Sequence, residues 1–140
     1  MARSHILYLA RSDAPGRKPL QEAIDALKFR LVLDHAYAPF ETSGYLPCTL
    51  EGEDAGFDIH FSEAKPDLSS FPALRARIGP RDGAMTFRWG GDPRERASAL
   101  IVSAALAQAF GALAHDPETD AVYEAPALIA MAREAAAAAL

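Results

Sequence analysis

The side chains best suited to acid–base or metal chemistry are two histidines and two carboxylates from separate parts of the chain. Asp58 and His60 alternate along one predicted strand and share its polar face, while His115 and Asp116 stand at the mouth of a predicted hairpin. Two imidazoles and a carboxylate can bind a transition metal or transfer a proton when a fold brings them together. A small metal-dependent or hydrolytic enzyme using Asp58, His60 and His115 is therefore an alternative function. Solvated polar side chains on an exposed sheet face are the simpler interpretation.

The other reactive groups do not match a catalytic or cofactor pattern. The single cysteine, Cys48, lies in an extended apolar run and is predicted to be a small buried hydrophobe, which fits a reducing cytosol. Asp34-His35 could supply two members of a catalytic triad, but the chain contains no serine in a G-x-S-x-G context to act as the nucleophile. Gly90-Gly91-Asp92 precedes a helix but matches no phosphate-loop motif, and its aspartate would repel a phosphate. We therefore expect no catalytic residue, no metal site and no cofactor, and the sequence favours a protein that is not an enzyme.

Charge is distributed unevenly along a chain whose net charge is −5. Residues 41–67 contain seven acids and one base, whereas residues 71–96 contain six arginines and three acids. Either the two segments neutralise each other on one surface, or the acidic segment forms a face for a basic partner. The acidic balance, and arginines that alternate with aromatics only at 87–89, predict that nucleic acid is not a partner.

One loop-like stretch has the composition of a protein-recognition segment. Residues 44–57 combine aromatic, acidic and glycine residues, a mixture suited to protein contacts, although an ordinary surface connection has the same composition. The residues predicted to bind a protein partner are Tyr45, Glu51, Glu53, Asp54, Asp58 and His60.

The elements that must position these residues follow from hydrophobic periodicity. An opening helix starts at Pro19 and has apolar residues at i, i+4, i+7 and i+11. Residues 29–34 also alternate like a short strand, and we favour a helix that continues to about Leu33. The remaining signals predict strands at 4–10, 45–50, 57–61, 86–89, 112–114 and 122–123, at most a short helix ending near Ile78, and a final helix starting at Pro126.

The strongest local signals lie in residues 84–125. Asp92 is predicted to cap a helix, and Glu95, three residues later, can reach back to the amide of the cap. This helix, 93–110, is apolar around almost its whole circumference, so it must be covered on more than one side. It could lie between the sheet and another helix, or form an oligomer interface. We expect a homodimer, and a structural subunit assembling through helix 93–110 is a second alternative function.

These elements predict a single α+β domain over residues 1–140. Its sheet is expected to be mainly antiparallel with five or six strands, and two or three helices are expected to pack chiefly on one face. The N-terminal apolar run, 6–10, is too short for a signal peptide or a membrane span. We therefore expect a cytoplasmic protein without a membrane partner.

In size, acidity, lack of an export signal and lack of a catalytic motif, the chain is similar in general type to small bacterial immunity proteins, which neutralise toxins by blocking them. The similarity is one of overall properties and transfers no residues. It implies a non-enzymatic protein-binding domain, with an immunity-type inhibitor as the specific form, whose acidic segment covers a basic site on its partner.

Overall fold

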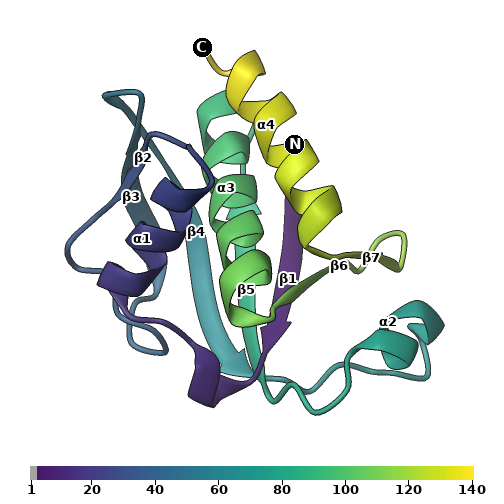
Figure 1. The fold of residues 1–140 in the computed structure, drawn as a ribbon. Coiled ribbons are helices and arrows are strands. Elements are labelled where there is room, and N and C mark those ends of the chain that lie inside the picture. Colours follow the sequence, from purple (N-terminus) through teal and green to yellow (C-terminus); the bar gives the residue numbers. More distant parts are fainter. Residues whose placement is uncertain (1–2) are drawn as a thin grey trace.

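A computed structural model describes residues 3–140, which form one open antiparallel sheet of seven strands with four α-helices (Figure 1). The α+β class is confirmed, but the sheet has seven strands rather than five or six, and there are four helices rather than two or three. The elements are β1 (Arg3–Leu9), a 3-10 turn η1 (Arg11–Asp13), α1 (Arg17–Ala26), β2 (Leu31–Leu33), β3 (Gly44–Leu50), β4 (Glu53–Glu63), α2 (Pro72–Arg77), β5 (Gly83–Trp89), α3 (Pro93–Phe110), β6 (Leu113–Asp116), β7 (Ala121–Tyr123) and α4 (Ala125–Ala138).

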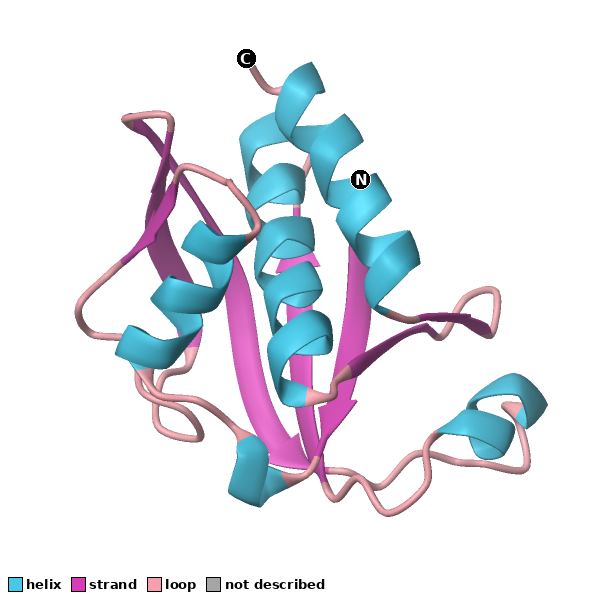
Figure 2. Cartoon of the chain, viewed as in Figure 1, coloured by secondary structure: helices cyan, strands magenta, loops and turns pink. Residues whose placement is uncertain are grey.

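The strands lie in the order β2-β3-β4-β5-β1-β6-β7, so the N-terminal strand is inserted near the middle of the sheet. The secondary structure in Figure 2 shows the helices α1, α3 and α4 together over one face of these strands. Successive residues of a strand point to opposite faces, so each strand offers one set of side chains to the helices and the other set to the opposite side.

The expectation that the first helix continues to about Leu33 was wrong. The helix α1 ends at Ala26, and Lys28 then adopts a left-handed backbone with φ of 69°, which turns the chain away from the helix axis. Residues 31–33 pair with β3 as the edge strand β2, which buries Leu31 and Leu33 and leaves Val32 exposed. The alternating pattern therefore prevailed over the helical one, because strand pairing satisfies the backbone and buries both leucines.

The helix α3 is the centre of the core. All ten residues from Ala97 to Leu106 are buried, because the sheet, α1 and α4 surround the helix (Figure 1). Small residues on α4, such as Ala132 and Ala135, are buried in the same cluster and let the two helices approach closely. The apolar circumference that suggested a homodimer is thus covered within the chain. The oligomeric state stays a prediction, but helix 93–110 offers no exposed apolar face for assembly.

A second, smaller core lies on the opposite face of the sheet. There Leu74 and Ile78 of the α2 region pack with Tyr8 of β1, Ala84 of β5 and Leu113 of β6. Three helices therefore share one face, as expected, and α2 covers only part of the other. The part of that second face formed by β2, β3 and β4 carries no helix.

The connection from β5 into α3 is fixed by side-chain caps. The carboxylate of Asp92 accepts a hydrogen bond from the amide of Arg94 at 2.9 Å, which confirms the predicted cap. The carboxylate of Glu95 accepts from the amide of Gly90 at 2.9 Å, so it reaches back beyond the predicted Asp92 amide to the end of the strand. Gly111, with φ of 72°, ends the helix in the left-handed conformation that glycine adopts readily.

We predict that Asp92→Ala lowers the free energy of unfolding by about 0.5–2 kcal/mol, because an amide in the first turn loses its acceptor. Asp92→Asn keeps a side-chain oxygen at the same place and should lose less than half of that amount. Urea unfolding of both variants checks this. A midpoint for Asp92→Ala equal to that of the wild type would show that the cap does not contribute to stability.

Candidate functional site

The part of the sheet that no helix covers carries four of the six residues predicted to bind a partner. Tyr45 on β3 and Asp54, Asp58 and His60 on β4 share the face opposite α1 and α3, because the alternate residues between them are buried against those helices. We call this surface the open sheet face. Its members are Val32, Tyr45, Pro47, Asp54, Asp58, His60 and Arg88.

The other two predicted residues lie elsewhere. Glu51 and Gly52 form the two-residue turn between β3 and β4, with φ of 52° and 81°, and the Glu51 carboxylate lies 3.7 Å from the Arg30 guanidinium. Glu53 is paired with the buried Leu50, so its side chain starts on the helix side of the sheet. The structure therefore separates the dense acidic run 51–54, because a turn and then strand alternation send neighbouring carboxylates in different directions.

Tyr45 is the aromatic centre of the open sheet face. Its side chain is 54% exposed, and its hydroxyl donates a hydrogen bond to the Ala55 carbonyl at 2.9 Å. Gly56 makes this position accessible: a Cβ there would lie 2.5 Å from the Leu46 carbonyl oxygen and 2.6 Å from the Tyr45 hydroxyl, and its φ is 138°. The ring therefore lies against the bare backbone of β4 in a fixed orientation.

Acidic groups gather near this tyrosine. Partial burial first, and then the charge of Glu95 and of further neighbours that include Asp92 and Asp54, raise the pKa of Tyr45. The side chain is therefore a neutral phenol at neutral pH.

The acidic and basic segments of the sequence meet on this face. Asp58 on β4 lies directly opposite Arg88 on β5, so these two charges face each other across neighbouring strands. Asp54 lies opposite Thr49 of β3, beyond the end of the β4–β5 pairing. Asp58 therefore has a base opposite it on the neighbouring strand, although the two side chains form no ion pair within residues 3–140, while Asp54 lies opposite a neutral residue.

The structure does not bring Asp58, His60 and His115 together. His60 and His115 lie in one row across the sheet, but Thr86 of β5 and Ile6 of β1 stand between them. At roughly 4.8 Å per strand, that separation is about 14 Å. His60 is exposed and bonds Ser43 at 3.0 Å, whereas His115 is fully buried. Within residues 3–140 no group of three potential metal ligands forms.

His115 instead joins two peripheral elements. Its Nε2 lies 2.9 Å from one oxygen of Asp120, whose other oxygen accepts a bond from the Ala73 amide at the start of α2. The ring of Phe71 packs edge-on at 4.6 Å. Burial opposes the charge on Asp120, but the bonds from Ala73 and His115 prevail and lower the pKa of that carboxyl group. This network holds α2 to the β6–β7 hairpin.

Cys48 is a buried thiol, as the sequence suggested. Burial, with a further contribution from the charge of Asp34, raises the pKa of Cys48 to about 12, so no thiolate forms at neutral pH.

No family model, curated protein or solved structure matches this chain significantly. Among residues 3–140, no helix combines the length and apolar character needed to cross a bilayer.

One buried polar residue that sequence reasoning did not select is His5. It is 3% exposed, stacks edge-on against Trp89 at 5.1 Å, and its Nε2 lies 2.8 Å from the Ser103 hydroxyl oxygen. The Ser103 hydroxyl gives its proton to the Ala99 carbonyl at 2.7 Å, so Nε2–H of His5 must be the donor to Ser103. Nδ1 then carries the free lone pair. The sequence did contain a signal for the burial of His5: along β1 it alternates in step with Leu7 and Leu9, which point into the core.

The burial of His5 leads us to predict that the protein loses stability in acid. Burial lowers the pKa of His5 to about 4 from 6.5, with the charge of Asp116 opposing part of that effect. The unfolded chain therefore binds the proton more readily than the folded one. Stability from this group is present above about pH 6.5 and falls as the pH drops toward 4, by about 3 kcal/mol in total.

The measurement is urea unfolding from pH 7.5 to pH 4. His5→Gln should remove this component of the acid-dependent loss, whereas the matched variant His60→Gln, at an exposed histidine, should keep it. If His5→Gln loses stability with the same pH profile as the wild type, His5 does not remain neutral in the folded state.

Proposed function

We propose that this chain is a non-enzymatic protein-binding domain that contacts its partner through the open sheet face. The observation that carries the proposal is Tyr45, a half-exposed aromatic residue in a fixed orientation and among acidic groups, on a part of the sheet that no helix covers. A solvated face is common in antiparallel sheets, so exposure alone would not support binding. The fixed aromatic ring supplies the further reason.

Tyr45 has the properties of a binding hot spot. Tyrosine combines a large apolar area with a polar end, and its contacts often dominate the energy of an interface. Because the ring already lies against Gly56, little conformational freedom remains to be lost when a partner covers it. Pro47, two residues along β3 from Tyr45, and Val32, which is 50% exposed toward the other end of the same face, add apolar surface.

The charges indicate the chemistry of the partner. Asp54 lies opposite a neutral residue, and the charges of Glu95, Asp92 and Asp54 contribute, after partial burial, to the raised pKa of Tyr45. The whole chain carries −5. We infer a protein partner that presents arginine or lysine beside an apolar group, which would be attracted over a distance and then pack on the ring.

An immunity-type inhibitor of a bacterial toxin is the specific form of this function that we favour, acting in the cytoplasm by covering a basic site. A binding surface without catalytic machinery suits inhibition by occlusion. An enzyme using Asp58, His60 and His115 is less well supported, because about three strand spacings separate His60 from His115. Assembly through helix 93–110 is less well supported because its apolar stretch, Ala97 to Leu106, is buried within the chain.

The test compares two charge reversals of equal size. A partner is captured from a lysate of the source organism with the full chain, identified by mass spectrometry and purified. Asp54→Lys with Asp58→Lys, on the open sheet face, should slow its association by ten-fold or more at low salt. Glu51→Lys with Glu53→Lys, off that face, should slow association less than the first pair, and by less than three-fold at about 0.15 M salt, where charges interact over only about 8 Å. Stopped-flow measurements at two salt concentrations separate steering from packing, since steering weakens as salt rises.

Tyr45→Ala should act on dissociation instead, raising the rate about 30-fold or more, as loss of a hot spot of roughly 2 kcal/mol requires. Thermal unfolding of each variant verifies that the fold is kept, and Asp54→Asn with Asp58→Asn serves if the lysines destabilise the sheet. Equal association rates for the two charge-reversed pairs, together with an unchanged dissociation rate for Tyr45→Ala, would exclude the open sheet face as the binding surface.

A further inference from the structure

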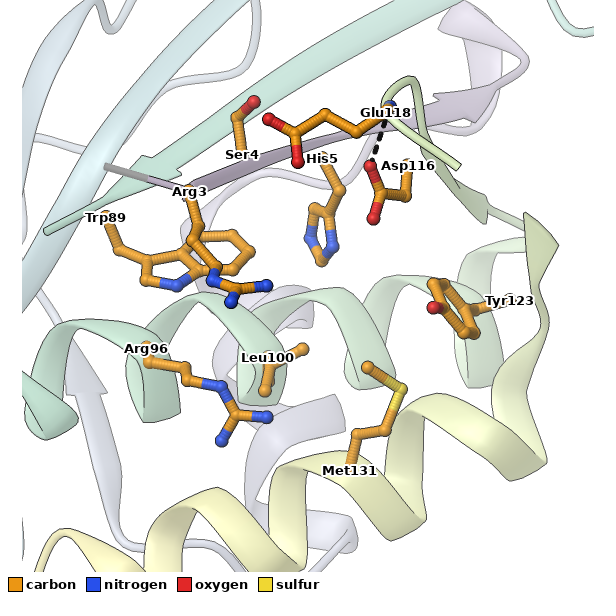
Figure 3. A pocket seen from close by; sticks show the side chains of 10 residues that line it. All are labelled: Arg3, Ser4, His5, Trp89, Arg96, Leu100, Asp116, Glu118, Tyr123 and Met131. Atoms are coloured by element: carbon orange, nitrogen blue, oxygen red, sulfur yellow. Dashed lines mark hydrogen bonds between the residues drawn. The ribbon is translucent and has the colours of Figure 1, made fainter. Parts of the chain in front are cut away.

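A pocket of about 110 Å³ lies on the opposite side of the sheet from the open sheet face, in the layer between the strands and the helices α3 and α4 (Figure 3). It arises because the buried residues of α4 pack with those of α3, while β6 and β7 extend away beyond β1 (Figure 1). Its walls come from six elements, and their side chains separate into a basic group, an acceptor group and an apolar group.

The basic group is Arg3 of β1 and Arg96 of α3. Both line the pocket: the Arg3 guanidinium lies beside the indole of Trp89, and the Arg96 side chain extends from α3 toward α4 (Figure 3). Within residues 3–140, neither makes an ion pair or a side-chain hydrogen bond to a carboxylate or carbonyl. Guanidinium groups bind carboxylates through paired N–H donors, so two of them facing one cavity form a site for an oxyanion.

The acceptor group is Asp116, Glu118 and His5. The Asp116 and Glu118 side chains flank His5 in Figure 3, and one oxygen of Asp116 is fixed by the Glu118 amide at 2.9 Å. Because the Nε2–H of His5 donates to Ser103, the remaining Nδ1 is a hydrogen-bond acceptor in a residue that lines the pocket. Two carboxylates and an imidazole lone pair are partners for an ammonium group, which has three N–H donors.

The apolar group, Leu100 of α3, Met131 of α4 and Tyr123 of β7, lines the rest of the pocket. A ligand that satisfies all three groups carries an anionic end, a cationic end and an apolar part within a few atoms of one another. The small volume excludes a nucleotide or a long peptide, and a peptide terminus has only one of the two charges.

We propose that this pocket binds a free α-amino acid with an apolar side chain. Its carboxylate is held by Arg3 and Arg96, its ammonium group by Asp116 with His5 and Glu118, and its side chain packs against Leu100 and Met131. The site is independent of the open sheet face, so a ligand here is either a second function or an effector of the first.

The protein contains its own reporter for this test. Trp89 is the only tryptophan in the chain and lines the pocket, so occupancy should change its fluorescence. L-leucine, L-methionine and L-phenylalanine are titrated against the full chain by fluorescence and calorimetry. Two analogues of leucine each lack one charge: leucinamide has no carboxylate, and 4-methylpentanoate has no ammonium group. We expect saturable binding of at least one amino acid, and at least ten-fold weaker binding of both leucine analogues.

Matched variants locate the site. Arg96→Gln and Asp116→Asn should each weaken amino-acid binding by ten-fold or more; the asparagine keeps an oxygen for the Glu118 amide, so the hairpin should be kept. Arg94→Gln, on the same turn of α3 but outside the pocket, should bind like the wild type, as should Asp54→Asn with Asp58→Asn on the open sheet face.

The proposal is overturned if none of the three amino acids binds saturably at concentrations up to about 10 mM. That limit is ten-fold above a dissociation constant of about 1 mM, which corresponds to a binding free energy of about −4 kcal/mol. Binding of 4-methylpentanoate as tight as that of leucine also overturns it, since the site would then recognise an anion only. Equal binding by Arg96→Gln and the wild type places the ligand elsewhere and has the same consequence. None of these results bears on the protein partner, whose binding is tested on the opposite face.

Discussion

The burial of α3 between the sheet and two other helices is the constraint from which the rest of the structure follows. Ten consecutive residues, Ala97 to Leu106, are covered, so the sheet must supply one side and α1 and α4 the others. That arrangement commits three of the four helices to one face. The opposite face keeps only the short α2, over β1 and its neighbours, and the strands β2 to β4 remain open there. The hollow between α4 and β1 has the same origin, because α4 packs with α3.

Local sequence signals predicted the elements whose boundaries depend only on neighbouring residues. Helix α3 begins at Pro93 after the Asp92 cap and ends before Gly111, as its flanking residues indicate. The strand β2 was the less favoured of two interpretations of residues 29–34, because its stability comes from pairing with β3, and three residues contain too little pattern to outweigh a helical spacing. Strand alternation correctly placed Asp58 and His60 on one face. It could not show that a turn divides the acidic run, nor which strands separate His60 from His115, because both depend on the order of strands in the sheet.

The pocket could not be predicted from the sequence for the same reason, because its lining residues are distant in sequence and are brought together by the order of the strands. Arg3 and Arg96 are 93 positions apart and line the same pocket only because β1 lies beside β5 and α3 packs over the sheet. The negative charge of the chain is also less concentrated in space than in sequence: Glu51 lies near Arg30, Glu63 near Lys65, and Asp58 faces Arg88. What remains on the open sheet face is a small number of acids around one tyrosine, and a partner that binds there must recognise the ring as well as the charge.

The measurement that tests this account most directly is side-chain NMR of the chain bound to its purified protein partner. Val32 methyl groups and the Tyr45 ring report on the open sheet face, and Leu128 of α4 and Leu20 of α1 report on the core beneath the helices. If the partner binds the open sheet face, the Val32 and Tyr45 signals shift or broaden in the complex, while those of Leu128 and Leu20 stay within about one linewidth of their free positions. Perturbation centred on α1 and α4, with Val32 and Tyr45 unchanged, would contradict it.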